Sequence, residues 1–244
     1  MHHRVHKKRN REMSVKIGII GAMDVEIARL RDQMKIERSL EKARMTFLEG
    51  MIGDTEVVVV KSGIGKVNAA ICVQILADTF NITHVINTGI AGSLDSKINI
   101  GDIVVSEDAC YHDVDATIFG YAPGEIPQLG VKSFKADPDL RKKAVEAIRS
   151  ADPDLGVFEG RIISGDQFIG GNLSKERLNN FNALCTEMEG AGIAQAAYLN
   201  HLPFVIIRAI SDKADGSAEV DYPAFEKKAA EDCARLVINF IKNF

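Results

Sequence analysis

The chain has 244 residues, of which 46% are hydrophobic and 26% charged, and its formal net charge is −4. This length and composition allow one sizeable core, so we expect a single domain over residues 13–244. The net negative charge argues against nucleic-acid binding, which depends on attraction between basic side chains and phosphate groups. The sequence also has no apolar run of about 18 residues that could span a bilayer. We therefore expect a cytoplasmic protein with no nucleic-acid or membrane partner.

The N-terminal residues 1–12 (MHHRVHKKRNRE) are polar and basic and show no apolar periodicity. We expect them to be a disordered leader or an upstream extension that takes no part in the fold. The alternative is an arm that binds nucleic acid or a membrane surface.

Short β-branched runs alternate with longer helical patterns along the rest of the chain. The expected strands cover residues 15–20, 57–60, 84–87, 103–106 and 204–207, and the expected helices cover 67–79 and 141–150. This alternation is typical of βαβ units. Because the expected strands are continuously apolar, they predict a mostly parallel central sheet that is covered by helices on both faces.

The C-terminal segment repeats an apolar residue at every fourth position: Phe225, Ala229, Cys233, Val237 and Ile241. This spacing predicts a long amphipathic helix whose apolar stripe packs on the sheet. Earlier in the chain, residues 119–127 (FGYAPGEIP) form a Gly- and Pro-punctuated loop with aromatic side chains. We expect this loop to line a pocket or to meet a partner.

The cysteines show no pattern of a metal or redox site. They stand far apart, without a CxxC pair or a His at ligand spacing, at Cys72, Cys110, Cys185 and Cys233. We therefore expect reduced thiols, no metal and no cofactor.

Ligands of α/β sheets bind beyond the carboxyl ends of the strands, so the residues after each expected strand are the candidates for a site. Acids stand out among them: Glu26 after the first strand, the Glu187–Glu189 segment at a strand-to-helix junction, and Asp212 after the last strand. Glu26 or Glu189 alone is typical of a solvated residue near a helix N-terminus. Asp212 stands at the end of an expected buried strand, where partial desolvation raises the affinity of a carboxylate for a proton. Three acids at one sheet edge favour acid–base chemistry.

Several common catalytic signatures are missing from the sequence. The turn at Gly63–Lys66 is not a phosphate-binding loop, since Val60 and Val67 stand where Gly and Ser or Thr are needed, and Asn68 replaces the third Gly of a dinucleotide fingerprint. A tight turn that opens a helix explains this segment. Neither H-E-x-x-H nor G-x-S-x-G occurs, so zinc-protease and serine-hydrolase chemistry are not indicated.

Seven segments together resemble the methylthioadenosine/S-adenosylhomocysteine nucleosidase family, in the family's order and with nearly its spacing. They are GIIGAMDVEI (18–27), KSGIGKVNAA (61–70), NTGIAGSL (87–94), YHDVDATIFGY (111–121), SGDQFI (164–169), EMEGAGIAQ (187–195) and RAISDKAD (208–215). The resemblance implies a three-layer α/β/α nucleoside phosphorylase/hydrolase fold with a mixed, mostly parallel sheet.

The resemblance also implies a function and a partner. The function is hydrolysis of the N-glycosidic bond of 5'-methylthioadenosine, S-adenosylhomocysteine and 5'-deoxyadenosine to adenine and the sugar, in methionine salvage and S-adenosylmethionine recycling. The implied assembly is a homodimer in which the loop from Phe119 to Pro127 completes the neighbour's site.

Roles follow from the matching motifs. The resemblance implies that Glu26 activates water with help from Arg208, and that Met188 and Glu189 hold the ribose. It also implies that Asp212, oriented by Ser211, protonates or hydrogen-bonds adenine N7. The remaining substrate contacts would come from Ala91 and Gly92 of the TGIAG turn, Phe168 and Ile169 at the adenine edge, and Met23, Ile64, Tyr222, the partner's Phe119 and the partner's Pro127 around the alkylthio tail. Such chemistry needs acids at both ends of the bond, because adenine leaves poorly as an anion while the sugar becomes cationic.

Three alternatives remain at this point. A purine nucleoside phosphorylase would need Arg side chains for phosphate where this chain has Glu26 and Asn87, and a carboxylate repels phosphate. A futalosine, aminodeoxyfutalosine or AMP nucleosidase would need a polar or cationic 5' pocket. A binding or regulatory protein would have lost a catalytic acid, yet Glu26, Glu189 and Asp212 are all present.

Overall fold

The computed structural model describes residues 14–170, 177–214 and 217–244, so the expected leader, residues 1–12, lies outside the described residues. The strands are β1 (Lys16–Gly21), β2 (Lys35–Lys42), β3 (Met45–Ile52), β4 (Thr55–Lys61), β5 (His84–Ser93), β6 (Ile103–Tyr111), β7 (Phe134–Lys135), β8 (Val157–Ser164), β9 (Cys185–Glu187) and β10 (Phe204–Asp212). The longer helices are α1 (Asp24–Gln33), α2 (Lys66–Phe80), α3 (Pro138–Ala151), α5 (Gly190–Leu199) and α6 (Ala218–Lys242).

All these strands belong to one mixed sheet whose centre is parallel. β4, β1, β5 and β10 pair in parallel with one another, in that order. β3 and β2 extend the sheet antiparallel beyond β4. On the other side the sheet curls back, because β10 pairs with β6, β6 with β8, β8 with β9, and β9 again with β5. The carboxyl end of β9 is thereby brought against the ends of β5 and β10.

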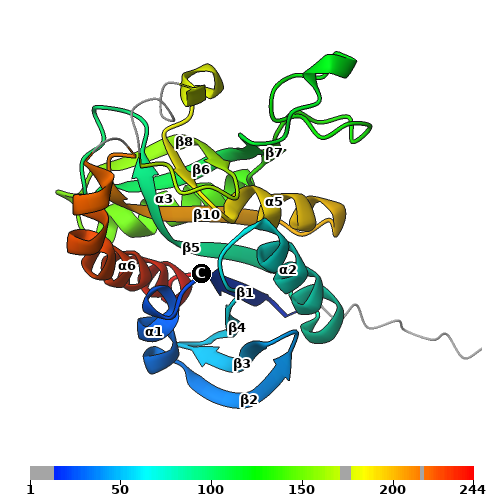
Figure 1. Ribbon diagram of the computed structural model, residues 1–244. Coiled ribbons are helices and arrows are strands. Elements are labelled where there is room, and N and C mark those ends of the chain that lie inside the picture. Colours follow the sequence, from blue (N-terminus) through cyan, green and yellow to red (C-terminus); the bar gives the residue numbers. More distant parts are fainter. Residues whose placement is uncertain (1–13, 171–176, 215–216) are drawn as a thin grey trace, which may run out of the picture.

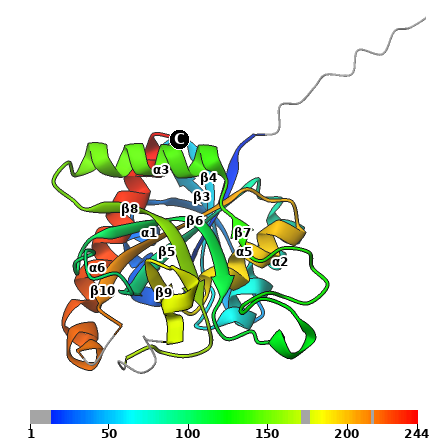
Figure 2. The same cartoon turned by 90° about the horizontal axis from the view of Figure 1, so that it is seen from above.

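Helices cover both faces of the sheet (Figures 1 and 2). α1, α3 and α6 lie on one face, where their apolar side chains form one core with Ile17, Val59, Ile86 and Ile207. α2 and α5 lie on the other face and pack against each other and against Val58, Val60 and Ile206. The predicted three-layer α/β/α architecture with a mixed central sheet is confirmed.

The sequence did not predict β2 and β3. β2 (KIERSLEK) carries charges on both faces and is almost entirely exposed, so no apolar alternation marks it. Its ladder with β3 holds it in place, from Lys35 opposite Met51 to Lys42 opposite Met45. Charged edge strands of this kind resist unwanted pairing with other chains.

The C-terminal helix was predicted correctly, with one correction to its apolar stripe. Ala229, Cys233, Val237 and Ile241 are buried against the sheet, but Phe225 is 39% exposed. Phe225 lies near the N-terminal end of α6, and the core of that face is formed by the later turns of the helix.

None of the helices in the described part of the chain is long and apolar enough to cross a membrane.

The unequal burial along α6 predicts unequal costs for the same substitution. Phe240 is 1% exposed, so Phe240→Ala should lower the free energy of unfolding by about 3–5 kcal/mol. Phe225→Ala, on the same helix, should cost less than half as much because part of the ring already contacts water. Urea unfolding of both variants measures the difference, and equal costs would contradict this account of the helix.

Candidate active site

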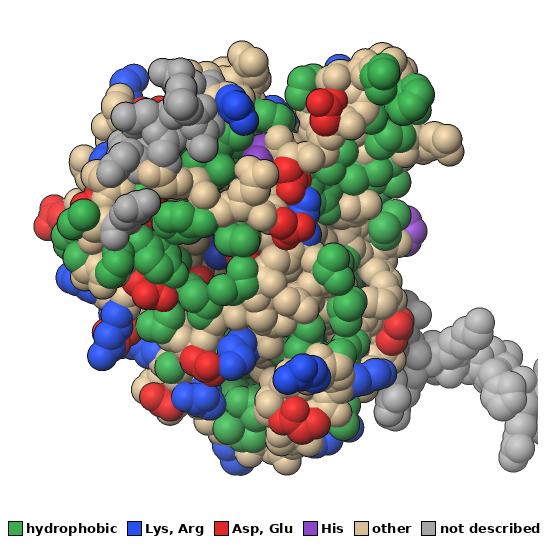
Figure 3. Space-filling model, viewed as in Figure 1, with side chains coloured by type: hydrophobic (Ala, Val, Ile, Leu, Met, Phe, Trp, Pro, Cys, Tyr) green, Lys and Arg blue, Asp and Glu red, His purple; other side chains and the backbone are tan. Residues whose placement is uncertain are grey.

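A cavity opens at the carboxyl edge of the parallel strands. It encloses about 560 Å³ of non-atom space, with its open mouth included. Figure 3 shows hydrophobic side chains gathered on this side of the molecule. The cavity is lined by Ala22, Met23, Glu26, Ile64, Ile90, Ala91, Gly92, Gln167, Phe168, Ile169, Thr186, Glu187, Met188, Glu189, Arg208, Ser211, Asp212 and Tyr222.

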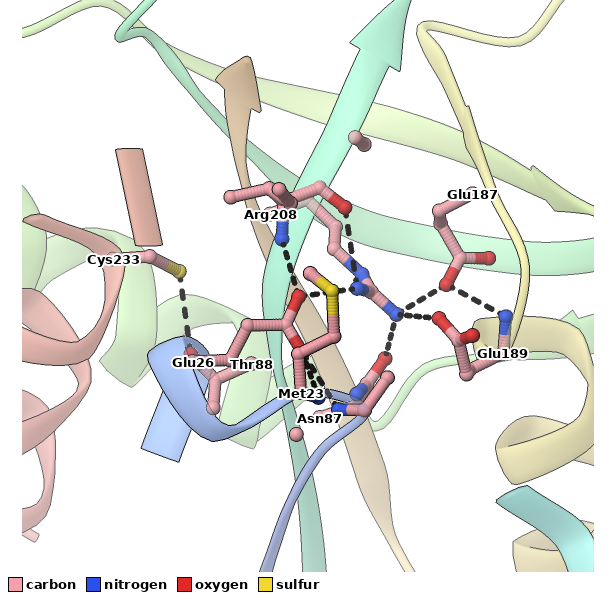
Figure 4. A network of polar contacts seen from close by, with 12 residues as sticks. Met23, Glu26, Asn87, Thr88, Glu187, Glu189, Arg208 and Cys233 are labelled. Atoms are coloured by element: carbon pink, nitrogen blue, oxygen red, sulfur yellow. Dashed lines mark hydrogen bonds and ion pairs between the residues drawn. The ribbon is translucent and has the colours of Figure 1, made fainter. Parts of the chain in front are cut away.

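One guanidinium joins three carboxylates at the floor of this cavity (Figure 4). Arg208 on β10 is 1% exposed, and its Nη1 lies 3.7 Å from Glu26 Oε1. Its Nη2 donates to Glu187 Oε2 and lies 3.5 Å from Glu189 Oε2. Burial disfavours the charged guanidinium, but the three carboxylates outweigh burial and hold the pKa of Arg208 above its usual value. The cluster therefore keeps a permanent positive charge at its centre.

A side-chain amide and a backbone carbonyl also accept hydrogen bonds from Arg208. Nη2 donates to Asn87 Oδ1 at 2.7 Å, and Nη1 donates to the Ile90 carbonyl at 3.2 Å. Asn87 is itself held, since its side-chain amide donates to the Ile20 carbonyl at 2.9 Å. The guanidinium is thus fixed in one orientation by β1 and β5.

Glu26 is a buried carboxylate in the first turn of α1. Its Oε2 accepts from the N–H groups of Ala22 and Met23 at 2.6 and 3.0 Å, and its Oε1 accepts from the Ile90 N–H at 3.1 Å. Burial raises the pKa of Glu26, and the attraction of Arg208 and these backbone donors opposes that rise only in part. A raised pKa suits a group that must take up a proton near neutral pH.

Glu187 is the acid of this cluster to which the sequence assigned no role. It accepts hydrogen bonds from the Glu189 N–H at 3.1 Å and the Gly190 N–H at 2.8 Å, which are the first donors of α5. The hydroxyl of Ser164 and Nη2 of Arg208 also donate to it. Glu187 therefore connects β8, the start of α5 and the central guanidinium.

Glu189 faces the N-terminus of α2 as well as Arg208. Its Oε1 accepts from the Gly65 N–H at 2.9 Å. Burial raises the pKa of Glu189, Arg208 lowers it and the charge of Glu187 raises it, and the net pKa is about 7. The turn at Gly63–Lys66 thus opens a helix, as predicted, and also supplies a donor to the site.

Asp212 ends β10 and is 2% exposed. Its Oδ2 accepts from the Ser211 hydroxyl at 2.9 Å, and its Oδ1 accepts from the Ala214 N–H at 2.8 Å. A Cβ on Gly92 would lie 2.7 Å from Oδ1, so a glycine is required beside this carboxylate. Gly89 has the same function beside the cluster, since a Cβ there would lie 2.4 Å from both Arg208 Nη1 and Glu26 Oε1.

The wall of the cavity near α6 is apolar. Phe168 packs edge to face on Tyr222, with ring centroids 5.4 Å apart, and the Tyr222 hydroxyl lies 3.7 Å from Met23 Sδ. Ile64, which also lines this cavity, is 53% exposed. Thioether and aromatic surfaces of this kind suit an apolar or sulfur-containing substituent.

Comparison with known proteins relates this geometry to a family. A sequence model of the phosphorylase superfamily matches residues 16–242. The 5'-methylthioadenosine/S-adenosylhomocysteine nucleosidase of Staphylococcus aureus is 42% identical over 223 residues, which cover 91% of this chain and 96% of that protein. The chain belongs to the 5'-methylthioadenosine/S-adenosylhomocysteine nucleosidase family.

Solved structures agree with this family. The nucleosidase of Neisseria meningitidis, in complex with methylthio-immucillin-A, matches with a TM-score of 0.90 and 38% identity over 94% of this chain and 99% of that one. Futalosine hydrolase of Helicobacter pylori matches with a TM-score of 0.89 and 31% identity over 95% of this chain and 99% of that one. The fold alone therefore does not separate these two activities.

The structure brings together most of the residues expected from the nucleosidase family motifs. All of them line the cavity except Phe119 and Pro127, which lie on a segment that projects from the body of the chain, drawn green at the upper right of Figure 1. Phe119 is 79% exposed there. The cavity also includes Ala22, Ile90, Gln167, Thr186 and Glu187, to which the sequence analysis assigned no role. All of these except Thr186 lie in the family segments, and Glu187 carried the further signal of an acid in the EMEG segment.

The arrangement around Glu189 predicts a pH dependence that Glu187 controls. If Glu189 acts as a carboxylate, kcat/KM should fall as the pH decreases through about 7, the pKa of Glu189. Glu187→Gln removes a negative charge that raises this pKa, so the acid limb of the profile should move to lower pH. Glu49→Gln, in an ion pair with Lys16 outside the cavity, is the matched control and should leave the limb in place. An acid limb that does not move in Glu187→Gln would show that Glu189 does not set it.

Proposed function

We propose that this chain hydrolyses the N-glycosidic bond of 5'-methylthioadenosine and S-adenosylhomocysteine, releasing adenine and the thioribose. The observation that carries this proposal is the convergence of Glu26, Glu189 and Asp212 on one cavity with an apolar wall. Family membership supports the same activity. Bond cleavage of this kind leaves a poor anionic leaving group and a cationic sugar, so it needs acids at both ends.

Asp212 is proposed to act on the leaving group. Protonation or hydrogen bonding at adenine N7 neutralises the charge that develops on the base, a contribution of about 10²- to 10⁴-fold for general acid catalysis. Ser211 donates to Asp212 Oδ2 and the Ala214 N–H donates to Oδ1, so the carboxyl group is held in one orientation. The backbone near Phe168 and Ile169 is proposed to contact the edge of the adenine.

Glu189 and Glu26 are proposed to act at the sugar. Glu189, with Met188, would hold the ribose hydroxyls and stabilise the positive charge of the transition state electrostatically. Glu26, with its raised pKa, would take the proton of the attacking water, and Arg208 holds it at 3.7 Å from Nη1. Ala91 and Gly92, which line the same cavity, are also proposed to contact the substrate.

Phosphorolysis is disfavoured by the charge of the cavity floor. Arg208 is the cation among the described residues that line the cavity, and its guanidinium is engaged by three carboxylates and Asn87. A phosphate dianion there would face like charges at close range. A neutral water molecule is not repelled by these carboxylates, so the site suits hydrolysis.

The 5' substituent is proposed to lie on the apolar wall formed by Met23, Ile64, Phe168 and Tyr222. A methylthio or homocysteinyl thioether packs well there, and so does the methyl group of 5'-deoxyadenosine, which we include among the substrates. These substrates place the chain in methionine salvage and S-adenosylmethionine recycling. Futalosine carries a more polar 5' group, for which this apolar wall offers fewer hydrogen-bond partners.

A product assay tests the hydrolytic reaction. The purified protein is incubated with methylthioadenosine first in phosphate-free buffer and then with phosphate, and the products are identified by mass. Adenine and methylthioribose should appear without phosphate and at an unchanged rate with it. A methylthioribose 1-phosphate product that requires phosphate would instead establish a phosphorylase, and faster turnover of futalosine than of methylthioadenosine would establish the other alternative.

Conservative amide substitutions test the proposed acids. Glu26→Gln and Asp212→Asn should each lower turnover by at least about 10²-fold, because each removes a proton-transfer group and little volume. Circular dichroism and thermal unfolding check that both variants remain folded. Near-normal turnover in a folded variant would remove that residue from the mechanism.

A homodimer is proposed to complete the site. The segment that carries Phe119 and Pro127 contributes nothing to the cavity of its own chain, yet Ile118 is 88% and Phe119 79% exposed. Apolar side chains this exposed are typical of surfaces that meet a partner. Sedimentation equilibrium should therefore give the mass of a dimer, and Phe119→Ala should raise the KM for methylthioadenosine; a fully active monomer would contradict the proposal.

One catalytic domain over residues 13–244 is also proposed. The superfamily match spans residues 16–242, and the strands from β1 to β10 share one sheet. Removal of residues 1–12 should then leave kcat and KM for methylthioadenosine unchanged, and a loss of activity on truncation would assign those residues a role.

A further inference from the structure

A second group of charges lies outside the proposed catalytic cluster, around Lys66 in the first turn of α2. Lys66 Nζ contacts both carboxylate oxygens of Asp113, at 2.7 and 2.6 Å, and lies 3.5 Å from Asp166 Oδ2. The ammonium group also lies 5.2 Å from the centre of the Tyr111 ring. The Lys66 and Asp113 side chains are only 19% and 18% exposed, so water and salt screen this pair less than a surface pair.

These charges join three segments that are far apart in the sequence. Asp113 follows β6, at the base of the projecting segment, and Asp166 follows β8, next to the cavity residues Phe168 and Ile169. The two loops are also connected directly, because the backbone N–H of Asp166 donates to Asp113 Oδ2 at 2.9 Å. Lys66 therefore holds α2, the loop after β6 and the loop after β8 against one another.

The packing of the two loops agrees with a fixed arrangement. A Cβ on Gly165 would lie 2.3 Å from His112 Cε1, so the loop after β8 runs close over the imidazole of the loop after β6. Burial raises the pKa of Asp113, but its hydrogen bonds to Lys66 and to the Asp166 N–H outweigh burial, and the net pKa lies below the usual value. Asp113 is therefore a charged partner of Lys66 at neutral pH.

The N-terminus of α2 connects this group to the proposed catalytic cluster. Gly65, its N-cap residue, has no side chain to accept a hydrogen bond, and Asp166 Oδ1 instead accepts from the Lys66 N–H at 3.0 Å. The adjacent Gly65 N–H donates to Glu189 Oε1 at 2.9 Å. Two neighbouring N–H groups at one helix terminus thus donate to different carboxylates, one to Asp166 and the other to Glu189, which we propose holds the ribose.

We propose that Lys66, paired with Asp113 and Asp166, is a positioning residue for the nucleosidase reaction. It holds the N-terminus of α2 where the Gly65 N–H contacts Glu189. It also holds the loop after β8 where Phe168 and Ile169 line the cavity. This inference rests on the proposed function for the identity of the ligand. Lys66 lines no part of the cavity itself, so its effect passes through the two segments that it joins.

The test compares substitutions on both sides of the ion pair. Lys66→Met keeps the aliphatic stem and removes the charge, and Asp113→Asn removes the partner without changing α2. Each should weaken the binding of methylthio-immucillin-A, measured by calorimetry, and lower kcat/KM for methylthioadenosine by about 10- to 100-fold, since small misplacements of site groups have effects of that size. Lys66→Arg keeps a cation and should recover most of the loss.

A double variant and a matched control separate positioning from stability. Lys66→Met combined with Asp113→Asn should be no worse than Lys66→Met alone, because both changes break one connection. Lys228→Met removes the same charge from a pair with Asp232 on the exposed side of α6, and it should leave binding and kinetics unchanged. Thermal unfolding confirms that each variant is folded at the assay temperature.

The outcomes distinguish this proposal from the proposed function. Turnover by the unmodified protein decides whether the chain is a nucleosidase, whereas the ratio of each variant to the unmodified protein in inhibitor binding decides the role of Lys66. A folded Lys66→Met protein that binds methylthio-immucillin-A within about twofold of the unmodified protein would overturn the positioning role. Should Lys66→Met not fold, Asp113→Asn with the same binding readout decides.

Discussion

The site depends on one buried cation that is shared by three buried carboxylates. Isolated, any of these charges would be too costly to bury at 1% to 7% exposure, but together with the backbone donors around them they compensate one another. Arg208 holds Glu26, Glu187 and Glu189 at fixed positions, and Glu187 in turn fixes the start of α5. Burial, together with the charge of Glu187, raises the pKa of Glu189. With three acids for one base, the surplus negative charge leaves the cavity floor attractive to a developing sugar cation.

The fold assembles this cluster by bringing separate strand ends to one edge. β1, β5 and β10 are parallel neighbours, so Glu26, residues 88–92 of β5 and Arg208 arrive at the same level of the sheet. The return of the sheet through β6, β8 and β9 adds Glu187 and Glu189 from the opposite direction. Close packing then demands glycine at Gly89 and Gly92, where a side chain would displace the charged groups.

The same charge distribution explains why hydrolysis fits better than phosphorolysis on a fold that supports both. The phosphorylase superfamily describes the scaffold, and the chemistry is decided by which side chains face the anomeric carbon. Here the cation at the floor is already neutralised by carboxylates, so the site accommodates a neutral water. The apolar wall of Met23, Ile64, Phe168 and Tyr222 then provides for the substituent at the 5' position.

By itself the sequence determined the strands β1, β4, β5, β6 and β10, the helices α2, α3 and α6, and the candidate acids. Continuous apolar strands, the i, i+4 stripe of α6 and the motif order predicted the layers of the fold and the family, because these depend on local periodicity and on residues near one another in the chain. Only the tertiary structure decided the rest. The exposed strand β2 carries no apolar signal, Phe225 left the predicted stripe, and the role of Glu187 depends on Arg208, which is 21 residues away and reaches it through the curled sheet. Contacts of this kind are fixed by strand order and register, and local sequence patterns do not encode those.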